Sequence, residues 1–301
     1  MKISIVGVGR VGATVGFALV TKGLAQELVL VSRSRASAEA EAQDLLHASA
    51  FTSGRVAIHA GDLAATAGSD VVLMCASVPQ PGAVASRDAL AAGNAQLMTE
   101  LAPKLGAASP ECVLIVITNP VDAMTYHALR LSGLPRQRVL GSGTLVDSAR
   151  FRALVSEKIG IHPDDVRAYI LGEHGDSQFP ALSMSMTGGM SFDHNELAAQ
   201  MFERTVLAGY EIMQSKGYTN YAIALAAALI VESIKDDACR TMPVSTLIDG
   251  YCGVRDVCLS VPAVIGSGGI QRVLEPPLTA DEQSAFRRSA AAVRRTIEAS
   301  S

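Results

Sequence analysis

Cysteine is scarce in this sequence, and its spacing excludes two of its common uses. Five cysteines are present, an odd number, and no two of them form a CxxC pair. A disulfide framework needs paired cysteines in a small secreted chain, and a zinc site needs closely spaced thiols. We therefore expect no metal, and reduced, mostly buried thiols in a cytoplasmic protein. The cysteines are Cys75, Cys112, Cys239, Cys252 and Cys258.

The chain also lacks basic excess and long apolar runs. Its 25 lysines and arginines against 29 aspartates and glutamates give a net charge of −4, whereas a nucleic-acid interface needs a clustered basic surface. The longest apolar run, Tyr221 to Val231, has about half the length of a membrane span. The apolar start of the chain is interrupted at Gly7, too early for a signal peptide. We expect a soluble protein with neither a nucleic acid nor a membrane as partner.

Two motifs of other nucleotide-using enzymes are absent. A P-loop needs the sequence GK[ST], and the dipeptide GK does not occur. Short-chain dehydrogenases need Tyr-x-x-x-Lys, and none of the six tyrosines is followed by lysine at that spacing. Those positions hold Arg130, Glu173, Gln214, Ala222, Leu225 and Arg255. Neither chemistry is available to this chain.

What the chain has in abundance is material for a core. Hydrophobic residues make up 49% and charged residues 18% of the 301 residues, which is a globular composition with room for two domains. In the first half, short β-branched apolar runs alternate with longer helix-like stretches, the pattern of βαβ units on a parallel sheet. The expected strands are Lys2 to Val6, Glu27 to Ser32, Arg55 to Ile58, Asp70 to Ala76, Cys112 to Thr118 and Arg138 to Leu140.

The glycine-rich turn Gly141-Ser142-Gly143 is the best domain boundary, dividing the chain into residues 1–143 and 144–301. The helices expected before it are Val11 to Thr21, Ala36 to Ala48, Arg87 to Leu105 and Val121 to Leu131. Beyond it we expect a helix at Thr144 to Ile159, a strand at Val166 to Leu171 and a mixed α+β region. A terminal helix at about Ala280 to Ala299 closes the chain.

The sequence Gly7-Val8-Gly9-Arg10-Val11-Gly12 is a GxGxxG turn between the first expected strand and helix. The first glycine permits the tight turn, the second lets the backbone approach a pyrophosphate, and the third lets the helix pack on the strand. The helix N-terminus offers free N–H groups to the phosphates. A purely structural glycine turn is the alternative, but the strand–turn–helix context favours nucleotide binding. We predict a Rossmann-type, doubly wound parallel sheet, followed by an α+β substrate domain.

The second expected strand ends without the acid that normally binds the adenosine ribose of NAD. It ends in Ser32-Arg33-Ser34-Arg35, and the next acid is Glu39. Two arginines and two hydroxyls suit a 2′-phosphate, which a carboxylate would repel. This turn favours NADP(H), with NAD(H) possible; the alternative is a basic turn that faces only water.

A histidine in the second half fits the proton transfer that ketone reduction requires. His174 lies between glycines in LGEHGDS, and Asp147 and Arg150 are spaced i, i+3 on a preceding helix. A carboxylate on one nitrogen of a histidine fixes its tautomer and favours the imidazolium. A lone histidine between glycines is more often structural, but here it accompanies the helix pair and a dinucleotide fold.

At this point the sequence resembles the L-lactate/malate dehydrogenase family. The segments that carry the resemblance occur in that family's order and cover nearly the whole chain. They are GVGRVG, ITNPVD, GTLVDSARFR, LGEHGDS, KGYTNYAIA and SVPAVIGSGGI.

The resemblance implies a role for each matching residue. His174 is the acid/base, Asp147 is its carboxylate partner, and Arg150 clamps the substrate carboxylate bidentately. Asn119 orients the substrate carbonyl and the cofactor. Arg87 polarises that carbonyl from a closing loop. Further residues with implied roles are Thr219, in the substrate pocket, and Ile223, against the nicotinamide.

In the family, one loop residue shortly before the equivalent of Arg87 discriminates between substrates. An arginine at that position favours malate, and a glutamine favours lactate-like acids. Gln80 takes that place, and a dicarboxylate would leave a buried charge unpaired. The loop departs from the family, with one residue missing after Gln80 and two more between Gly82 and Arg87. On the opposite wall, Gly209 leaves room. We expect a monocarboxylic L-2-hydroxy acid, either lactate-like or with a larger side chain, with malate as the alternative.

Three further expectations concern the whole molecule. A nucleotide-binding paralogue without turnover is a remote alternative, because no catalytic residue is missing. The resemblance implies a homodimer or homotetramer. Arg152 and Arg167 match positions where some bacterial lactate dehydrogenases hold a sugar bisphosphate; two unrelated surface arginines are the alternative.

Overall fold

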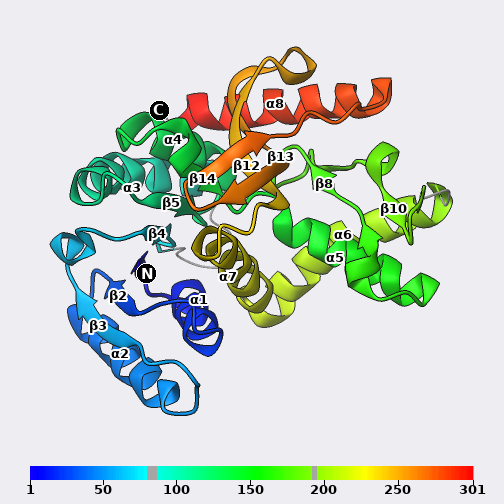
Figure 1. Cartoon of the computed structure of the whole chain (residues 1–301). Helices are drawn as coiled ribbons and strands as arrows, with labels where there is room; N and C mark the ends of the chain where they lie inside the picture. The colour runs from blue at the N-terminus through cyan, green and yellow to red at the C-terminus, as the bar shows by residue number, and fades with distance from the viewer. Residues whose placement is uncertain (80–86, 192–194, 301) are drawn as a thin grey trace.

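The computed structural model describes residues 1–79, 87–191 and 195–300 and is built on one nine-stranded sheet (Figure 1). Six strands run parallel in the order β3-β2-β1-β4-β5-β6. That is the doubly wound dinucleotide-binding order, with a switch point between β1 and β4. The six are β1 (Lys2–Val6), β2 (Glu27–Val31), β3 (Ala57–Gly61), β4 (Val71–Met74), β5 (Val113–Val116) and β6 (Val139–Gly141). The predicted fold class is confirmed.

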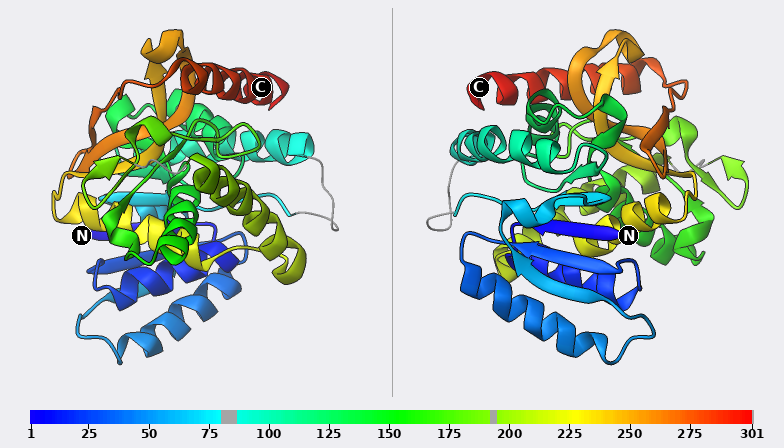
Figure 2. Two further views of the ribbon diagram at one scale, coloured as in Figure 1. Left: turned by 90° about the vertical axis from the view of Figure 1, so that its right-hand side faces the viewer. Right: turned by 60° about the vertical axis from the view of Figure 1, so that its left-hand side comes forward.

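Alternating side chains of the parallel strands enter two different cores. Leu28 and Leu30 of β2 lie in one apolar cluster, whereas Val29 and Val31 lie in another on the opposite face. Residues of α1, α2 and α7 fill the first cluster, and residues of α3 and α4 fill the second. Figure 2 shows α1 and α2, in blue, and the C-terminal helix α8, in red, on opposite sides of the molecule. The helices of the first half are α1 (Arg10–Thr21), α2 (Arg35–Ser49), α3 (Arg87–Ala108) and α4 (Val121–Leu131), with short 3-10 turns η1 (Leu63–Thr66) and η2 (Arg136–Arg138).

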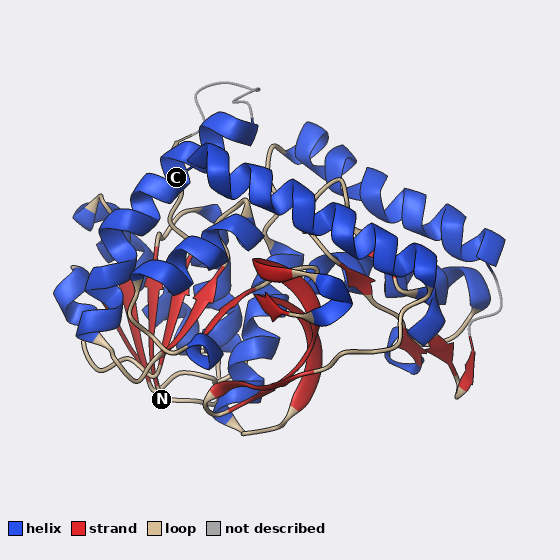
Figure 3. Cartoon of the chain, turned by 90° about the horizontal axis from the view of Figure 1, so that it is seen from above, coloured by secondary structure: helices blue, strands red, loops and turns tan. Residues whose placement is uncertain are grey.

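The second half of the chain extends the same sheet rather than starting a separate one. An antiparallel ribbon, β14-β13-β12, joins the parallel strands through the pair Ser245–Gly141. Figure 3 shows this ribbon curving away from the row of short parallel strands. Because the sheet crosses residue 143, the division into 1–143 and 144–301 stays a prediction. The three strands are β12 (Arg240–Asp249), β13 (Arg255–Gly266) and β14 (Gly269–Val273).

Helices dominate the remainder of the second half. They are α5 (Leu145–Ile159), α6 (Asn195–Lys216), α7 (Tyr221–Lys235) and α8 (Ala280–Ser300), with 3-10 turns η3 (Pro163–Asp165), η4 (Leu182–Met184) and η5 (Tyr251–Gly253). Among the described residues, no single helix has the length and apolar character of a membrane span; α6 and α7 pass such a test only as a pair bent by 119°.

Two predicted strands are wrong in their extent: the strand expected at Arg55 to Ile58 is Ala57–Gly61, and Val166 to Leu171 forms two short strands, not one. The small strands are β7 (Val166–Arg167), β8 (Ile170–Leu171), β9 (Phe179–Pro180), β10 (Met186–Thr187) and β11 (Met190–Ser191). The two halves of Val166 to Leu171 pair with different partners: Val166–Arg167 pairs with β10, whereas Ile170–Leu171 pairs with β9. The backbone of Ile170 also bonds to side chains at the start of α5, donating to Oγ of Ser148 at 2.9 Å and accepting from Oγ1 of Thr144 at 2.6 Å.

Candidate active site

A cavity of about 980 Å³ lies at the carboxyl ends of β1, β2 and β4. Its floor is the glycine turn. Gly7 has φ +101°, and a Cβ there would lie 2.2 Å from the backbone nitrogen of Ala76. A Cβ on Gly12 would lie 2.2 Å from the carbonyl oxygen of Gly7. The close approach of α1 to the turn after β1 therefore requires glycine at both positions. The predicted residues that line the cavity are Gly7, Gly9, Arg10, Val11, Gly12, Ser32 and Arg33.

Gly9 opens this turn to a ligand. It is exposed and is the N-cap of α1, and a Cβ on it would meet no atom within 4 Å. No side chain caps the helix, so its first N–H groups face the cavity with the positive end of the helix dipole. This is the geometry that binds a diphosphate, and the residues present fit a dinucleotide.

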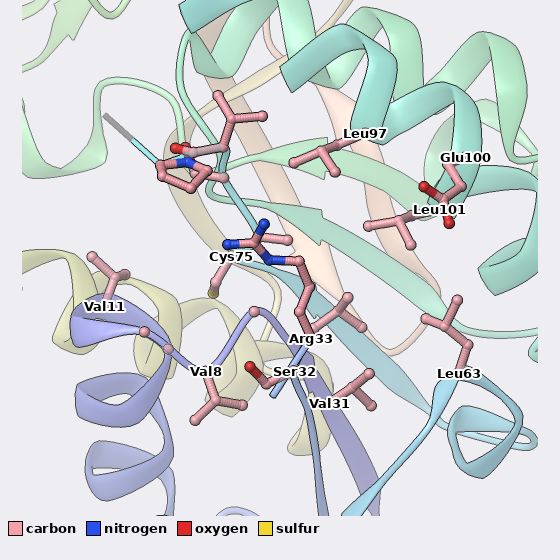
Figure 4. Close-up of a pocket in the computed structure, with 18 of the residues that line it drawn as sticks. Val8, Val11, Val31, Ser32, Arg33, Leu63, Cys75, Leu97, Glu100 and Leu101 are labelled. Atoms are coloured by element: carbon pink, nitrogen blue, oxygen red, sulfur yellow. The ribbon is translucent and has the colours of Figure 1, made fainter. Parts of the chain in front are cut away.

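The two arginines of the turn after β2 lie in different surroundings. Arg33 extends from the strand end into the cavity beside Ser32 (Figure 4). Arg35 lies on the first turn of α2, where its Nε is 2.7 Å from Oε1 of Glu39. Of the two predicted phosphate ligands, the structure therefore brings only Arg33 to the cavity. On the opposite wall stands Glu100 (Figure 4), whose carboxylate pairs with Lys104 at 3.3 Å.

Two residues of the second half of the chain lie against α1. The guanidinium of Arg10 lies 4.3 Å from the ring centroid of Tyr218, in the turn between α6 and α7. Ile223, on the first turn of α7, packs half-buried against the same core cluster as Val11. Ile223 thus lies on a helix that contacts α1, and its contact with the nicotinamide stays a prediction.

The catalytic candidates converge across one buried carboxylate. Asp147, on the first turn of α5, is 2% exposed. Its Oδ2 lies 2.5 Å from Nδ1 of His174, and its Oδ1 accepts a hydrogen bond of 3.1 Å from Nη1 of Arg150. Because an ionised carboxylate only accepts, Nδ1 of His174 carries a proton and Nε2 is left for a substrate.

The electrostatics of this pair suit an acid that works near neutral pH. The negative charge of Asp147 raises the pKa of His174 to about 8, against the opposing effects of burial and of the Arg150 charge. Burial alone would raise the pKa of Asp147, but the charges of His174 and Arg150 outweigh it and lower that pKa. The imidazolium and the carboxylate therefore stabilise each other.

The predicted substrate-binding residues surround Arg150 only in part. A Cβ on Gly209 of α6 would lie 3.3 Å from Nη1 of Arg150, so this glycine leaves the guanidinium open. Asn119 is exposed just after β5, and Thr219 is half-buried just before α7. Gln80 lies outside the described residues. So does the side chain of Arg87, the residue at which α3 begins.

Sequence reasoning missed one carboxylate near the histidine. Asp122, on the first turn of α4, accepts a hydrogen bond of 2.7 Å from the backbone N–H of His174. Burial raises the pKa of Asp122 to about 6, although hydrogen bonds from Ser245 and His174 work against this. The available signal was a single acid between the apolar residues Val121 and Ala123, and an acid is unusual at a buried position.

The predicted effector residues line a separate cavity of about 800 Å³. Arg152 and Arg167 both face it, joined by Arg240 at the start of β12, which was not predicted, and by Asp164. Nε of Arg152 is buried and has no hydrogen-bond partner among the described residues. Three cations around a single acid make an anion the better ligand for this cavity.

The same fold thus carries a dinucleotide cradle and an arginine next to a histidine–aspartate pair, the two sites that a nicotinamide-dependent dehydrogenase needs. The chain belongs to the lactate/malate dehydrogenase family. The model of that family's NAD binding domain matches residues 1–141, and the model of its alpha/beta C-terminal domain matches residues 144–301. The class predicted from the sequence, a nicotinamide-dependent 2-hydroxy-acid dehydrogenase of this family, is confirmed.

Relatives match along almost the whole chain. An L-lactate dehydrogenase of a Thermoanaerobacter species is 39% identical over 99% of this chain and 98% of its own length. One of Salinibacter ruber is 38% identical over 97% and 95%. The structure of a minor L-lactate dehydrogenase from Enterococcus mundtii superposes with a TM-score of 0.95 at 30% identity, covering 99% of this chain and 97% of that one.

Proposed function

We propose that the chain interconverts a monocarboxylic 2-oxo acid and the corresponding L-2-hydroxy acid, with His174 as the acid/base. The contact of 2.5 Å between His174 and Asp147, beside the guanidinium of Arg150, carries the proposal. The test is oxidation of the reduced nicotinamide by a panel of 2-oxo acids, with wild type and His174→Ala compared. A cytoplasmic location is part of the proposal, because free cysteines suit that compartment.

The residues divide the work of the reaction. A reduced nicotinamide nucleotide, held by the glycine turn and by Ser32 and Arg33, would supply the hydride. Arg150 holds the substrate carboxylate through its planar fork, and Nε2 of His174 gives its proton to the carbonyl oxygen as charge develops there. Asp147 holds the ring and stabilises its charged form, and Asn119 orients the carbonyl. Arg87 polarises the same oxygen from the start of α3.

For the substrate we propose a lactate-like acid, because the relatives named above are L-lactate dehydrogenases and Gln80 supplies no charge for a second carboxylate. The lack of a side chain at Gly209, where a Cβ would lie 3.3 Å from Nη1 of Arg150, supports side chains larger than methyl. Malate is the alternative, and a comparison of oxaloacetate with monocarboxylates separates the two.

For the cofactor we propose a preference for NADP(H), with NAD(H) accepted. Ser32 replaces the usual ribose-binding acid, and Arg33 extends into the cavity next to it. A 2′-phosphate carries roughly −1.5 to −2 charges, by analogy with other phosphate monoesters. Arg35 takes no part, since Glu39 already neutralises it.

For assembly we propose a homodimer or homotetramer. Large apolar side chains are exposed on α1, which contacts both α2 and α7, and on α2, α6 and α7 as well. They are Phe17 on α1, Leu46 on α2, Leu207 and Met213 on α6, and Leu225 on α7. Leu225 is 58% exposed and Phe17 is 54% exposed. A second copy that covers such a surface removes it from water. Sedimentation equilibrium measures the mass directly.

For the second cavity we propose a phosphorylated effector such as a sugar bisphosphate, held by Arg152, Arg167 and Arg240. The unpartnered, buried Nε of Arg152 supports this site. Adding fructose 1,6-bisphosphate should lower the substrate KM or raise Tm, and Arg240→Ala should weaken the response. If KM, oligomer size and Tm all stay the same, the effector site is wrong, and Arg152 and Arg167 are two unrelated surface arginines.

A further inference from the structure

Asp122 joins three elements of the fold around the candidate acid. Its side chain projects from the first turn of α4, and the residue is 2% exposed. Oδ2 accepts a hydrogen bond of 2.7 Å from the backbone N–H of His174, in the loop between β8 and β9. Oδ1 accepts one of 2.6 Å from Oγ of Ser245, at the middle of β12. Each carboxylate oxygen therefore holds a different segment.

A carboxylate is a costly choice for this position. Neighbouring residues of α4, Val121, Ala123 and Met124, lie in an apolar cluster, and a buried carboxylate loses its hydration. The N-terminus of α4 and the two donors offset part of that cost. The hydrogen bond that Asp122 accepts from the backbone of His174 indicates a use for this carboxylate beyond packing.

The same helix start also carries Asn119, three residues before Asp122. Asn119 is tied to α3, because its carbonyl oxygen accepts a hydrogen bond of 2.7 Å from Nδ2 of Asn94. One short segment, residues 119–122, thus carries both Asn119, which is proposed to orient the substrate, and Asp122, which binds the backbone of His174. Their separation is set by the start of one helix rather than by two independent loops.

We infer that Asp122 is a positioning residue for catalysis: it holds the backbone of His174 so that the imidazole meets Asp147 on one side and the carbonyl oriented by Asn119 on the other. The inference rests on the proposed role of His174. Asp122 acts through the histidine and touches no substrate.

Asp122 also contributes to the charge around the imidazole. The charged groups that face His174 are Asp147, Asp122 and Arg150. Both aspartates raise the pKa of His174, and Arg150 lowers it. Removing the charge of Asp122 while keeping its shape must therefore shift the titration of His174 to lower pH, which a role in packing alone would not do.

The test is Asp122→Asn, compared with wild type in 2-oxo-acid reduction across pH. The amide can still accept from the His174 N–H, and the Ser245 hydroxyl can rotate to accept from its NH₂. We expect kcat to fall about tenfold, because small misplacements of a catalytic group cost that much or more. KM for both substrates should stay near wild type, and the alkaline limb should move to lower pH.

Three further variants make the result decisive. Asp256→Asn is the matched control: its exposed carboxylate pairs with Arg130, and kcat and the pH limb should stay at wild-type values. If Asp122→Asn does not fold, Ser245→Ala takes its place, and kcat should fall about threefold through the looser carboxylate. Wild-type kcat and pH limb in the folded variant would overturn the inference. His174→Ala distinguishes the proposed function from the positioning role. If His174→Ala stays active, His174 is not the acid. If His174→Ala is inactive while Asp122→Asn behaves like wild type, only the positioning role of Asp122 is wrong.

Discussion

Nδ1 of His174 and Oδ2 of Asp147 lie 2.5 Å apart, although 27 residues separate them along the chain. The contact joins the first turn of α5 to the loop after β8. It leaves Nε2 as the only nitrogen of the ring that can reach a substrate. This contact determines which nitrogen of His174 transfers the proton, and it is the basis of the pH dependence of activity predicted below.

Asp147→Asn should lower kcat by about 100-fold or more, because an amide can hold the wrong tautomer and cannot stabilise an imidazolium. Cofactor binding should be almost unchanged, since Asp147 lies off the dinucleotide cavity. Steady-state kinetics and NAD(P)H fluorescence titration measure the two effects. A variant with more than a third of wild-type kcat would contradict the proposed partnership.

Wild-type activity should depend on pH in opposite ways for the two directions. The neighbouring Asp147 raises the pKa of His174 to about 8. Reduction needs the protonated ring, so its kcat/KM is full below this pKa and is lost as pH rises through about 8. Oxidation of the hydroxy acid needs the neutral ring and should rise over the same range. Parallel pH profiles in both directions would show that another group titrates.

Arg150→Lys should raise KM for the 2-oxo acid by roughly 10- to 100-fold, because losing one charge-assisted hydrogen bond costs about 1.5–3 kcal/mol. A lysine keeps the charge but not the planar fork. Arg130→Lys, at an exposed pair with Asp256, is the control. Equal KM values in wild type and Arg150→Lys would remove Arg150 from the substrate site.

The two arginines after β2 make a matched pair for the cofactor. Arg33→Ala should lower kcat/KM for NADPH by about 10-fold and leave NADH nearly unchanged, because only the phosphate loses a partner. Arg35→Ala should change neither, since Arg35 pairs with Glu39. Higher salt should imitate Arg33→Ala. Equal or better kcat/KM with NADH in the wild type would show that this turn only faces water.

Pocket size can be tested at Gly209. A Cβ there would lie 3.3 Å from Nη1 of Arg150, so Gly209→Ala should disfavour larger 2-oxo acids more than pyruvate. Each methylene that the wild type buries contributes about 0.8 kcal/mol. Oxaloacetate should be a poor substrate, and Gln80→Arg should improve it. Wild-type kcat/KM higher for oxaloacetate than for every monocarboxylate would indicate malate dehydrogenase.

Local sequence predicted most of the fold because the parallel strands other than β3, which reads AIHAG, are short and mostly apolar runs between turn residues. The prediction for the run from Val166 failed, because its two halves pair with two different strands, β10 and β9, and its own composition does not show where the pairing changes. The glycine turn and the His174 motif were likewise readable, as chemistry dictates their residue types.

Other parts of the site could not be read from sequence because they depend on tertiary contacts. Arg33 and Arg35 look equivalent in the sequence, but Arg35 is the first residue of α2 and forms an ion pair with Glu39 one turn further along that helix. Asp122 has no recognisable spacing to His174, and only the folded chain brings the two within hydrogen-bond distance. Arg240 reaches the second cavity in the same way, from a strand far along the chain.

The most direct test of the central claim is kcat for pyruvate reduction by His174→Ala, measured beside wild type at a pH below the His174 pKa of about 8. Loss of a general acid lowers kcat by about 100- to 10,000-fold, with binding of the reduced cofactor unchanged. We predict this result. More than about a tenth of wild-type kcat in a folded His174→Ala variant would contradict the account, because the proton would then come from another group.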